Sequence, residues 1–204
     1  LIIIGYGDPR MKLHPFRLER YFAKYEFSAP YLLCSSDCES MAVGDLLALE
    51  PEAREQFLSL WLGYTESAGN PELRHAITGL YERIEADQVL VHAGAEEAIF
   101  NFMNVALNPG DHIVVHAPYY QSLGAVAKGI GAEVSEWGAD PQRSWELNLD
   151  DLRRALTGRT KVVVVNFPHN PTGFLPSAEF VRELSRTSDE HGFLVFSDEV
   201  YRGL

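Results

Sequence analysis

Two short stretches of this sequence carry side chains that could bind and activate a small molecule. Residues 166–173 contain two asparagines, a histidine, two prolines and a glycine, and residues 197–201 contain an aspartate and a tyrosine. Each stretch follows an apolar run that is typical of a buried strand, at 161–165 and at 193–196. In open α/β sheets, ligands bind at the edge where the carboxyl ends of parallel strands meet. Turn chemistry alone could account for one such stretch, but two of them on successive strands favour a binding site.

Residues 92–98 are rich in small side chains and join a predicted strand to a predicted helix. Small residues let backbone N–H groups approach an anion, and the start of a helix carries a partial positive charge. This stretch could therefore hold a phosphate group, although tight packing of a helix on a strand also needs small residues. The stretch matches neither the dinucleotide-binding fingerprint nor the phosphate-binding loop of nucleotide triphosphatases.

The remaining candidate side chains are aromatic, acidic or amide-bearing. Tyr120 follows a predicted strand at 112–116, where a tyrosine could stack on a flat ring or simply pack. Asp198 follows an apolar strand, so its partial burial would be costly unless a cation or hydrogen-bond donors met it. The amide of Asn170, the phenol of Tyr201 and the candidate phosphate-binding stretch at 92–98 add to these groups. Together they predict one planar, phosphorylated, nitrogen-containing ligand.

Composition and charge argue against several other functions. The 204 residues include 17 Lys and Arg against 29 Asp and Glu, a net charge of −12, which disfavours a nucleic-acid surface. Cys34 and Cys38 have no second pair of ligands nearby, and His112 and His116 lie in a strand-like context, so we expect no metal site. We find no secretory signal and no membrane span, because residues 1–4 are too short an apolar run for either.

The order of the predicted elements indicates an α/β fold. Apolar runs predict five strands, at residues 89–91, 112–116, 133–137, 161–165 and 193–196. Helices are predicted between them, at residues 96–107, 121–129, 150–156 and 177–190. This alternation predicts a mostly parallel sheet with helices on both faces. Upstream of these elements, further helices are predicted within residues 11–30 and at 44–49, 52–62 and 71–84.

Two of these upstream helices are expected to bury an apolar face. In the helix at 52–62, the expected face comprises Phe57, Leu58, Trp61 and Leu62. In the helix at 71–84, the expected buried residues are Leu73, Ala76, Ile77 and Leu80.

Five motifs in a fixed order resemble those of the class I/II aminotransferases, fold-type I enzymes that use pyridoxal phosphate. The motifs lie at residues 64–74, 94–98, 117–120, 170–173 and 197–201. The similarity covers roughly residues 60–204, about the first two-thirds of the large domain of these enzymes.

The resemblance also implies a domain organisation. Residues 1–50 would form an arm and small-domain segment, with 1–10 as a candidate leader, and residues 51–204 would form the first part of the large, cofactor-binding domain. The rest of that domain and the C-terminal small domain would lie outside this chain.

The resemblance assigns roles around pyridoxal 5'-phosphate. The backbone of Gly94, Ala95 and Glu96 would hold the phosphate, and Tyr64 would reach that phosphate from the neighbouring subunit of a homodimer. In this family the peptide bond before the proline is often cis in two of the site loops, here before Pro118 and Pro171.

Four more residues would contact the cofactor ring. Tyr120 would stack on the pyridine ring, and Asp198 would pair with the ring nitrogen and keep it protonated. Asn170 and Tyr201 would hydrogen-bond the ring hydroxyl oxygen.

The chain departs from the family pattern in two respects. The Schiff-base lysine and the arginine that holds the substrate carboxylate lie further along the chain in the family. The chain's lysines occupy none of that context: Lys12, Lys24, Lys128 and Lys161. We therefore expect a fragment that is inactive alone. Residues 34–41 also replace the glycine-rich substrate-side segment common in aspartate-type members, so the substrate stays open.

The sequence thus predicts a cytoplasmic aminotransferase of amino-acid metabolism that moves an amino group between an amino acid and a 2-oxo acid. A lyase or cyclase on the same fold is the alternative, because the cofactor motifs do not separate these reactions. A more distant alternative is the effector domain of an aminotransferase-like transcription regulator. That reading requires a winged DNA-binding domain upstream, and residues 1–60 have neither the basic charge nor the length for one.

Overall fold

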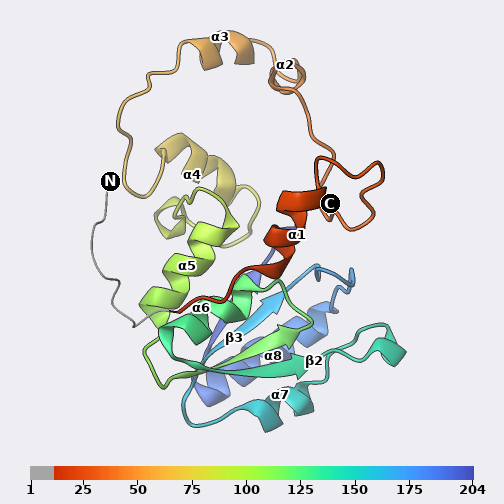
Figure 1. Ribbon diagram of the computed structural model, residues 1–204. Coiled ribbons are helices and arrows are strands. Elements are labelled where there is room, and N and C mark those ends of the chain that lie inside the picture. Colours follow the sequence, from red (N-terminus) through yellow and green to blue (C-terminus); the bar gives the residue numbers. More distant parts are fainter. Residues whose placement is uncertain (1–11) are drawn as a thin grey trace, which may run out of the picture. The chain divides into compact units, whose positions relative to one another are not determined.

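The computed structural model describes residues 12–204, which form two compact units. One unit combines the residues up to Leu33 with Gly94–Leu204, and the other is Cys34–Ala93 (Figure 1). The candidate leader at residues 1–10 lies outside the described residues. The expected domain boundary between residues 50 and 51 stays a prediction.

The first unit is built on a parallel sheet with the strand order β2-β1-β3-β4. The strands are β1 (His112–Ala117), β2 (Glu133–Gly138), β3 (Thr160–Asn166) and β4 (Leu194–Asp198). The predicted parallel sheet is therefore confirmed. The predicted strand at 89–91 is wrong: it lies in the second unit, where the Val91 N–H donates to the Ala68 carbonyl at 2.9 Å instead of pairing in the sheet.

Helices cover both faces of this sheet (Figure 1). They are α5 (Ala95–Ala106), α6 (Ser122–Ile130), α7 (Leu149–Ala155) and α8 (Ala178–His191). Successive side chains of a strand point to opposite faces, so the central strands supply two cores. Val115 and Val164 pack with α5 and α6, whereas Val114 and Val163 pack with α7 and α8. All four valines are fully buried. The prediction of helices on both faces is confirmed.

The ends of α8 follow from its sequence. The Ser177 hydroxyl accepts a hydrogen bond from the Phe180 N–H at 3.1 Å, which satisfies one of the free donors of the first turn. Gly192 ends the helix in the left-handed conformation at φ 72°. The same unit also contains α1 (Arg17–Tyr25) and η2 (Pro141–Arg143).

The second unit contains short helices and no buried residue, although all of residues 34–93 are described. Its helices are α2 (Val43–Leu47), α3 (Ala53–Leu58), α4 (Pro71–Thr78) and η1 (Ala86–Gln88). The predicted apolar faces are wrong here, because no core exists within the unit to receive them. Trp61 and Leu62 are more than nine-tenths exposed, and Phe57, Leu58, Leu73, Ala76 and Leu80 are exposed too.

The stretch that precedes and begins α4 is held by local contacts. Gly69 has a φ of +107°, and a Cβ placed there would lie 2.4 Å from the Val91 side chain. The Asn70 side chain accepts hydrogen bonds from the N–H groups of the second and third helical residues, and Pro71 occupies the first position. Arg74 donates to the Val89 carbonyl at 2.9 Å, which fixes the segment that follows η1. The motif at residues 64–74 therefore has a structural role, because its residues hold the start of α4 in place.

Replacement of Gly69 with alanine should lower the free energy of unfolding by about 2 kcal/mol or more. The added methyl group meets both a disfavoured backbone angle and the Val91 side chain. Urea denaturation of the complete protein measures this change. Gly44→Ala is the matched control, because Gly44 lies in α2 with no atom within 4 Å of the position that its new methyl group would take. Equal stabilities of the two variants would contradict the proposed strain.

No helix within residues 12–204 is long and apolar enough to cross a bilayer. The same residues contain no group of three or more His, Cys, Asp or Glu side chains that could hold a metal ion. Cys34 and Cys38 are exposed free thiols.

Candidate active site

The carboxyl ends of β3 and β4 are hydrogen-bonded to each other at Asn166 and Asp198, which pair in the sheet register. The Asn166 amide donates to the Asp198 carbonyl at 2.9 Å, and the Phe167 N–H donates to the same oxygen at 3.0 Å. The two stretches that the sequence singled out therefore begin side by side, at the sheet edge where ligands bind in this class of fold.

The loop after β3 presents Asn170 from a fixed backbone. The Asn170 N–H donates to the Asn166 side-chain oxygen at 2.7 Å, and the Gly173 N–H donates to the His169 carbonyl at 2.7 Å. Gly173 has a φ of +73°, which favours glycine. The half-buried Asn170 side chain makes no hydrogen bond within residues 12–204, so its amide is available to a ligand.

Three proline peptide bonds near these strand ends are cis. Those before Pro118 and Pro171 were expected from the family resemblance and are confirmed. The third, before Pro168, was not expected.

His169 joins the loop after β3 to the loop after β1. Its Nε2 lies 2.7 Å from the Pro118 carbonyl oxygen, which can only accept, so Nε2 carries the proton. Its Nδ1 therefore accepts from the Thr172 hydroxyl at 2.7 Å. From the sequence, His169 had no predicted role beyond the loop that contains it. Its burial between two loops is a tertiary feature that no local pattern reveals.

A second buried histidine lies against the first. The ring of His116 stacks on that of His169 with centroids 3.7 Å apart and an interplanar angle of 21°. Both ring nitrogens of His116 are buried and have no hydrogen-bond partner within the described chain. Burial lowers the pKa of His116 to about 3, with a smaller effect from His169, and burial also lowers the pKa of His169. Both rings are therefore neutral near pH 7.

The other paired histidine of the sequence analysis, His112, has a structural environment. Its ring nitrogens lie 2.7 Å from the Thr160 hydroxyl and 2.9 Å from the Ser135 hydroxyl. Burial lowers the pKa of His112. Its contacts with two hydroxyl groups give it a structural role in the sheet.

Asp198 is a half-buried carboxylate that lacks a cation. Its Oδ1 accepts one hydrogen bond, from the Val200 N–H at 3.1 Å, and no Lys or Arg of residues 12–204 pairs with it. Burial raises the pKa of Asp198, and the nearby Glu199 carboxylate raises it further, while the hydrogen bond from Val200 opposes them. A positively charged ligand group beside Asp198 would relieve this desolvation.

Tyr120 and Tyr201 lie on loops that start at the same sheet edge, and both side chains are half-buried. The Tyr120 hydroxyl donates to the Glu19 carboxylate at 3.1 Å. Its ring contacts the Phe16 ring, with centroids 4.9 Å apart and a tilt of 52°. These contacts from the N-terminal arm were not expected from the sequence, because the partners are about a hundred residues apart in the chain.

The first turn of α5 is open to an anion. Gly94 has a φ of +94°, no side chain caps the helix, and no atom lies within 4 Å of the position a Cβ would take. The helix is held on the sheet in part by Phe102, whose ring lies 4.7 Å from that of Phe196 in β4. Since α5 leads through a short loop into β1, it runs antiparallel to the strands and its first turn faces their carboxyl ends.

Tyr64 is fully exposed and belongs to the second unit, whereas the other candidates belong to the first. The residues of the first unit do fit the expected ligand. They offer an uncapped helix start for a phosphate, an unpaired carboxylate for a ring cation, an aromatic face and a free amide.

A family model described as aminotransferase class I and II matches residues 32–204. The chain belongs to this family. It is 36% identical over 146 residues to the aspartate/prephenate aminotransferase of Thermus thermophilus, covering 69% of this chain and 38% of the relative. It is 34% identical over 172 residues to the capreomycidine synthase of Streptomyces vinaceus, covering 83% of this chain and 44% of that relative.

Solved structures agree with this assignment. A pyridoxal-phosphate-dependent aminotransferase from Streptococcus suis matches with a TM-score of 0.86 and 30% identity, covering 93% of this chain and 52% of that one. Thermus thermophilus aspartate aminotransferase matches with a TM-score of 0.65 and 35% identity, over 67% and 37% of the two chains. The fold is that of the fold-type I enzymes, and the chain spans between a third and about half of the relatives it matches.

Proposed function

We propose that the complete protein containing this chain is a pyridoxal-phosphate-dependent aminotransferase that transfers an amino group between an amino acid and a 2-oxo acid. The observation that carries the proposal is Asp198, a half-buried carboxylate without a cation at the end of β4. Family membership and relatives named aminotransferases support the same reaction.

When bound, pyridoxal phosphate would supply an electron sink that labilises the Cα proton of an amino acid. In this proposal Asp198 pairs with the protonated ring nitrogen and keeps the proton there. Tyr120 packs against the ring, and Asn170 and Tyr201 hydrogen-bond the ring hydroxyl oxygen. These contacts orient the ring, and the buried setting of Asp198 strengthens its interaction with a positive charge.

The phosphate would bind at the first turn of α5, where the backbone of Gly94, Ala95 and Glu96 offers N–H groups and the helix dipole. His169 positions this site indirectly, since its bond to Pro118 ties the loop of Tyr120 to the loop of Asn170. Contact of Tyr64 with the phosphate of a neighbouring subunit, assembly as a homodimer and a cytoplasmic location are further parts of the proposal that follow from the family resemblance.

A lyase or cyclase is the second candidate. The relative that covers 83% of this chain is named a capreomycidine synthase and not an aminotransferase. The cofactor-facing residues would be the same in either enzyme, because the fold and its cofactor contacts do not set the outcome of the reaction.

The test is a visible absorption spectrum of the complete protein, before and after borohydride, followed by a panel of amino acids. We expect a yellow band that borohydride fixes to the protein, and its loss with one amino acid to give pyridoxamine phosphate and a 2-oxo acid. A band that persists while a keto acid or a cyclic product is released would replace the aminotransferase with the second candidate. Absence of a band with cofactor added would overturn both.

A further inference from the structure

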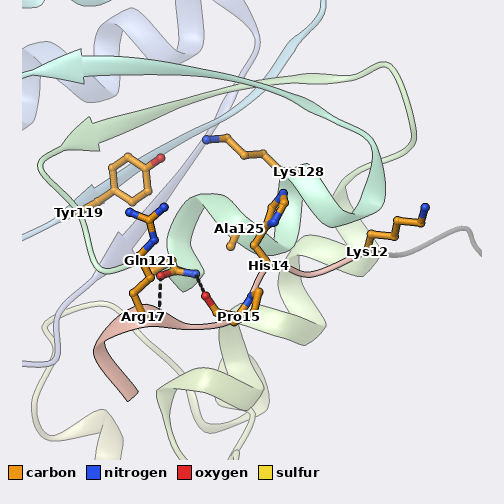
Figure 2. A pocket seen from close by; sticks show the side chains of 8 residues that line it. All are labelled: Lys12, His14, Pro15, Arg17, Tyr119, Gln121, Ala125 and Lys128. Carbon is orange, nitrogen blue, oxygen red and sulfur yellow. Dashed lines mark hydrogen bonds between the residues drawn. The ribbon is translucent and has the colours of Figure 1, made fainter. Parts of the chain in front are cut away.

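A surface cavity lies on the first unit, between the start of the described chain and α6 (Figure 2). Its volume is about 280 Å³, the size of a small metabolite. It is lined by Lys12, His14, Pro15, Arg17, Tyr119, Gln121, Ala125 and Lys128. Because Tyr119 points to this cavity and its neighbour Tyr120 contacts Phe16 and Glu19, the cavity adjoins the proposed active site without sharing its cofactor-facing residues.

Gln121 connects the two walls of the cavity through hydrogen bonds of its side chain. The Arg17 N–H donates to the Gln121 side-chain oxygen at 3.1 Å, and the Gln121 side-chain nitrogen donates to the Pro15 carbonyl at 3.1 Å (Figure 2). Gln121 immediately precedes α6, and its spacing of four residues to Ala125 and seven to Lys128 places all three on the same side of the helix. Residues 12–17 and this face of α6 thus form a cavity with defined walls.

The lining of the cavity is cationic, although the chain carries a net charge of −12. Lys12, Arg17 and Lys128 contribute three fixed positive charges, and no lining residue is acidic. None of the three fixed cations forms an ion pair within residues 12–204. Outside the lining, the Glu136 carboxylate accepts a hydrogen bond from the Tyr119 hydroxyl at 3.3 Å.

Unpaired like charges around one cavity attract multivalent anions. A cleft lined by charge of one sign focuses the field and raises the local concentration of ions of the opposite sign. The Arg17 guanidinium can bind a carboxylate or phosphate through two parallel hydrogen bonds, and the lysines act as point charges. The tyrosine hydroxyl adds a neutral donor or acceptor at the wall.

We propose that this cavity is a binding site for a small polyanion carrying two or more phosphate or carboxylate groups. Such a ligand bridges residues 12–17 and α6, and so it holds the N-terminal arm in contact with Tyr120. The site does not depend on the proposed reaction, because none of its lining residues belongs to the proposed cofactor contacts.

The test is isothermal titration of the complete protein, already loaded with pyridoxal phosphate, with pyrophosphate and with citrate at constant ionic strength. Pyrophosphate probes phosphate groups and citrate probes carboxylates, and acetate serves as the monovalent comparison. The variants are Arg17→Gln and Lys128→Gln. Their matched controls are Arg20→Gln, which is exposed on the same helix, and Lys161→Gln, an exposed lysine of β3.

We expect saturable binding of one pyrophosphate or citrate per chain, with acetate much weaker. Each cavity variant should weaken binding by about tenfold or more, because a charged hydrogen bond is lost, and each control should change it by less than about twofold. Stronger binding of pyrophosphate or of citrate tells which group the site prefers. Absence of saturable binding, or equal binding by cavity variants and controls, would overturn the proposal. Binding that appears only when pyridoxal phosphate is removed would assign the anion to the proposed phosphate site at the first turn of α5. That result would also overturn the proposal.

Discussion

Replacement of Asp198 with asparagine is expected to lower kcat/KM for transamination by at least about 10²-fold to 10³-fold. Asparagine keeps the size of the side chain and removes the negative charge that, in the proposed function, holds a proton on the pyridine nitrogen. The loss should appear in kcat, since the charge acts on the reacting ring more strongly as electrons move into it. Steady-state kinetics of the complete protein with a saturating cofactor concentration measure it.

Asp198→Asn should not lower the stability of the folded state. Burial raises the pKa of Asp198, so folding favours its neutral form. In the cofactor-free protein its charge therefore disfavours folding above the ordinary pKa of 3.8, and this penalty fades as the pH falls through the raised pKa. Asp198→Asn should leave the free energy of unfolding at pH 7 unchanged or slightly higher, which separates a catalytic role from a structural one.

Glu199→Gln is the matched control for this variant. Glu199 is the next residue in the chain, and its carboxylate forms an ion pair with Arg202 at 2.7 Å. Its replacement should change kcat/KM by only a few-fold. Wild-type turnover in Asp198→Asn, or an equal loss in the two variants, would contradict the assigned role.

The sheet could be predicted from the sequence because its central strands are buried on both faces. Such strands appear as continuous apolar runs, and residues 112–116 and 161–165 agree with β1 and β3 to within one residue at either end. The run at 89–91 has the same composition but only three residues. Its backbone groups are used by Ala68 and Arg74, which are distant in sequence, so composition alone misassigned it.

The sequence predicted where the residues of the candidate site lie in the fold, but it did not predict which side chains contact one another. Placement of Asn170 and Asp198 at strand ends follows from element order, because parallel strands bring their carboxyl ends to one edge. The bond from His169 to Pro118 and the contacts of Phe16 and Glu19 with Tyr120 depend on packing between distant segments. Local patterns do not encode such pairs. The helices of the second unit give a further example. Their apolar periodicity predicted buried faces, but periodicity does not reveal where the packing partner of such a face lies, and these faces are exposed.

The stacked histidines beneath the site loops should make the folded state sensitive to acid. The His116 side chain is 2% exposed, and burial lowers its pKa from the ordinary 6.5 to about 3. A buried imidazole that stays neutral while the unfolded chain takes up a proton favours the unfolded state as the pH falls. The stability that His116 contributes is therefore present above pH 6.5 and is lost progressively as the pH falls from 6.5 toward 3. Burial lowers the pKa of His112 and His169 as well, so they act in the same direction.

Lowering the pH from 7 to 5 should thus reduce the free energy of unfolding by about 2 kcal/mol through His116 alone. Urea denaturation of the complete protein at the two pH values, at one protein concentration, measures the loss. His116→Phe keeps an aromatic ring beside Trp137 and Phe167 but cannot titrate, so its loss between pH 7 and 5 should be smaller by about the same 2 kcal/mol. His75→Gln, at an exposed position of α4, should keep the wild-type loss. A His116→Phe variant that loses as much stability as the wild type would show that this ring is protonated as easily in the folded protein as in the unfolded chain.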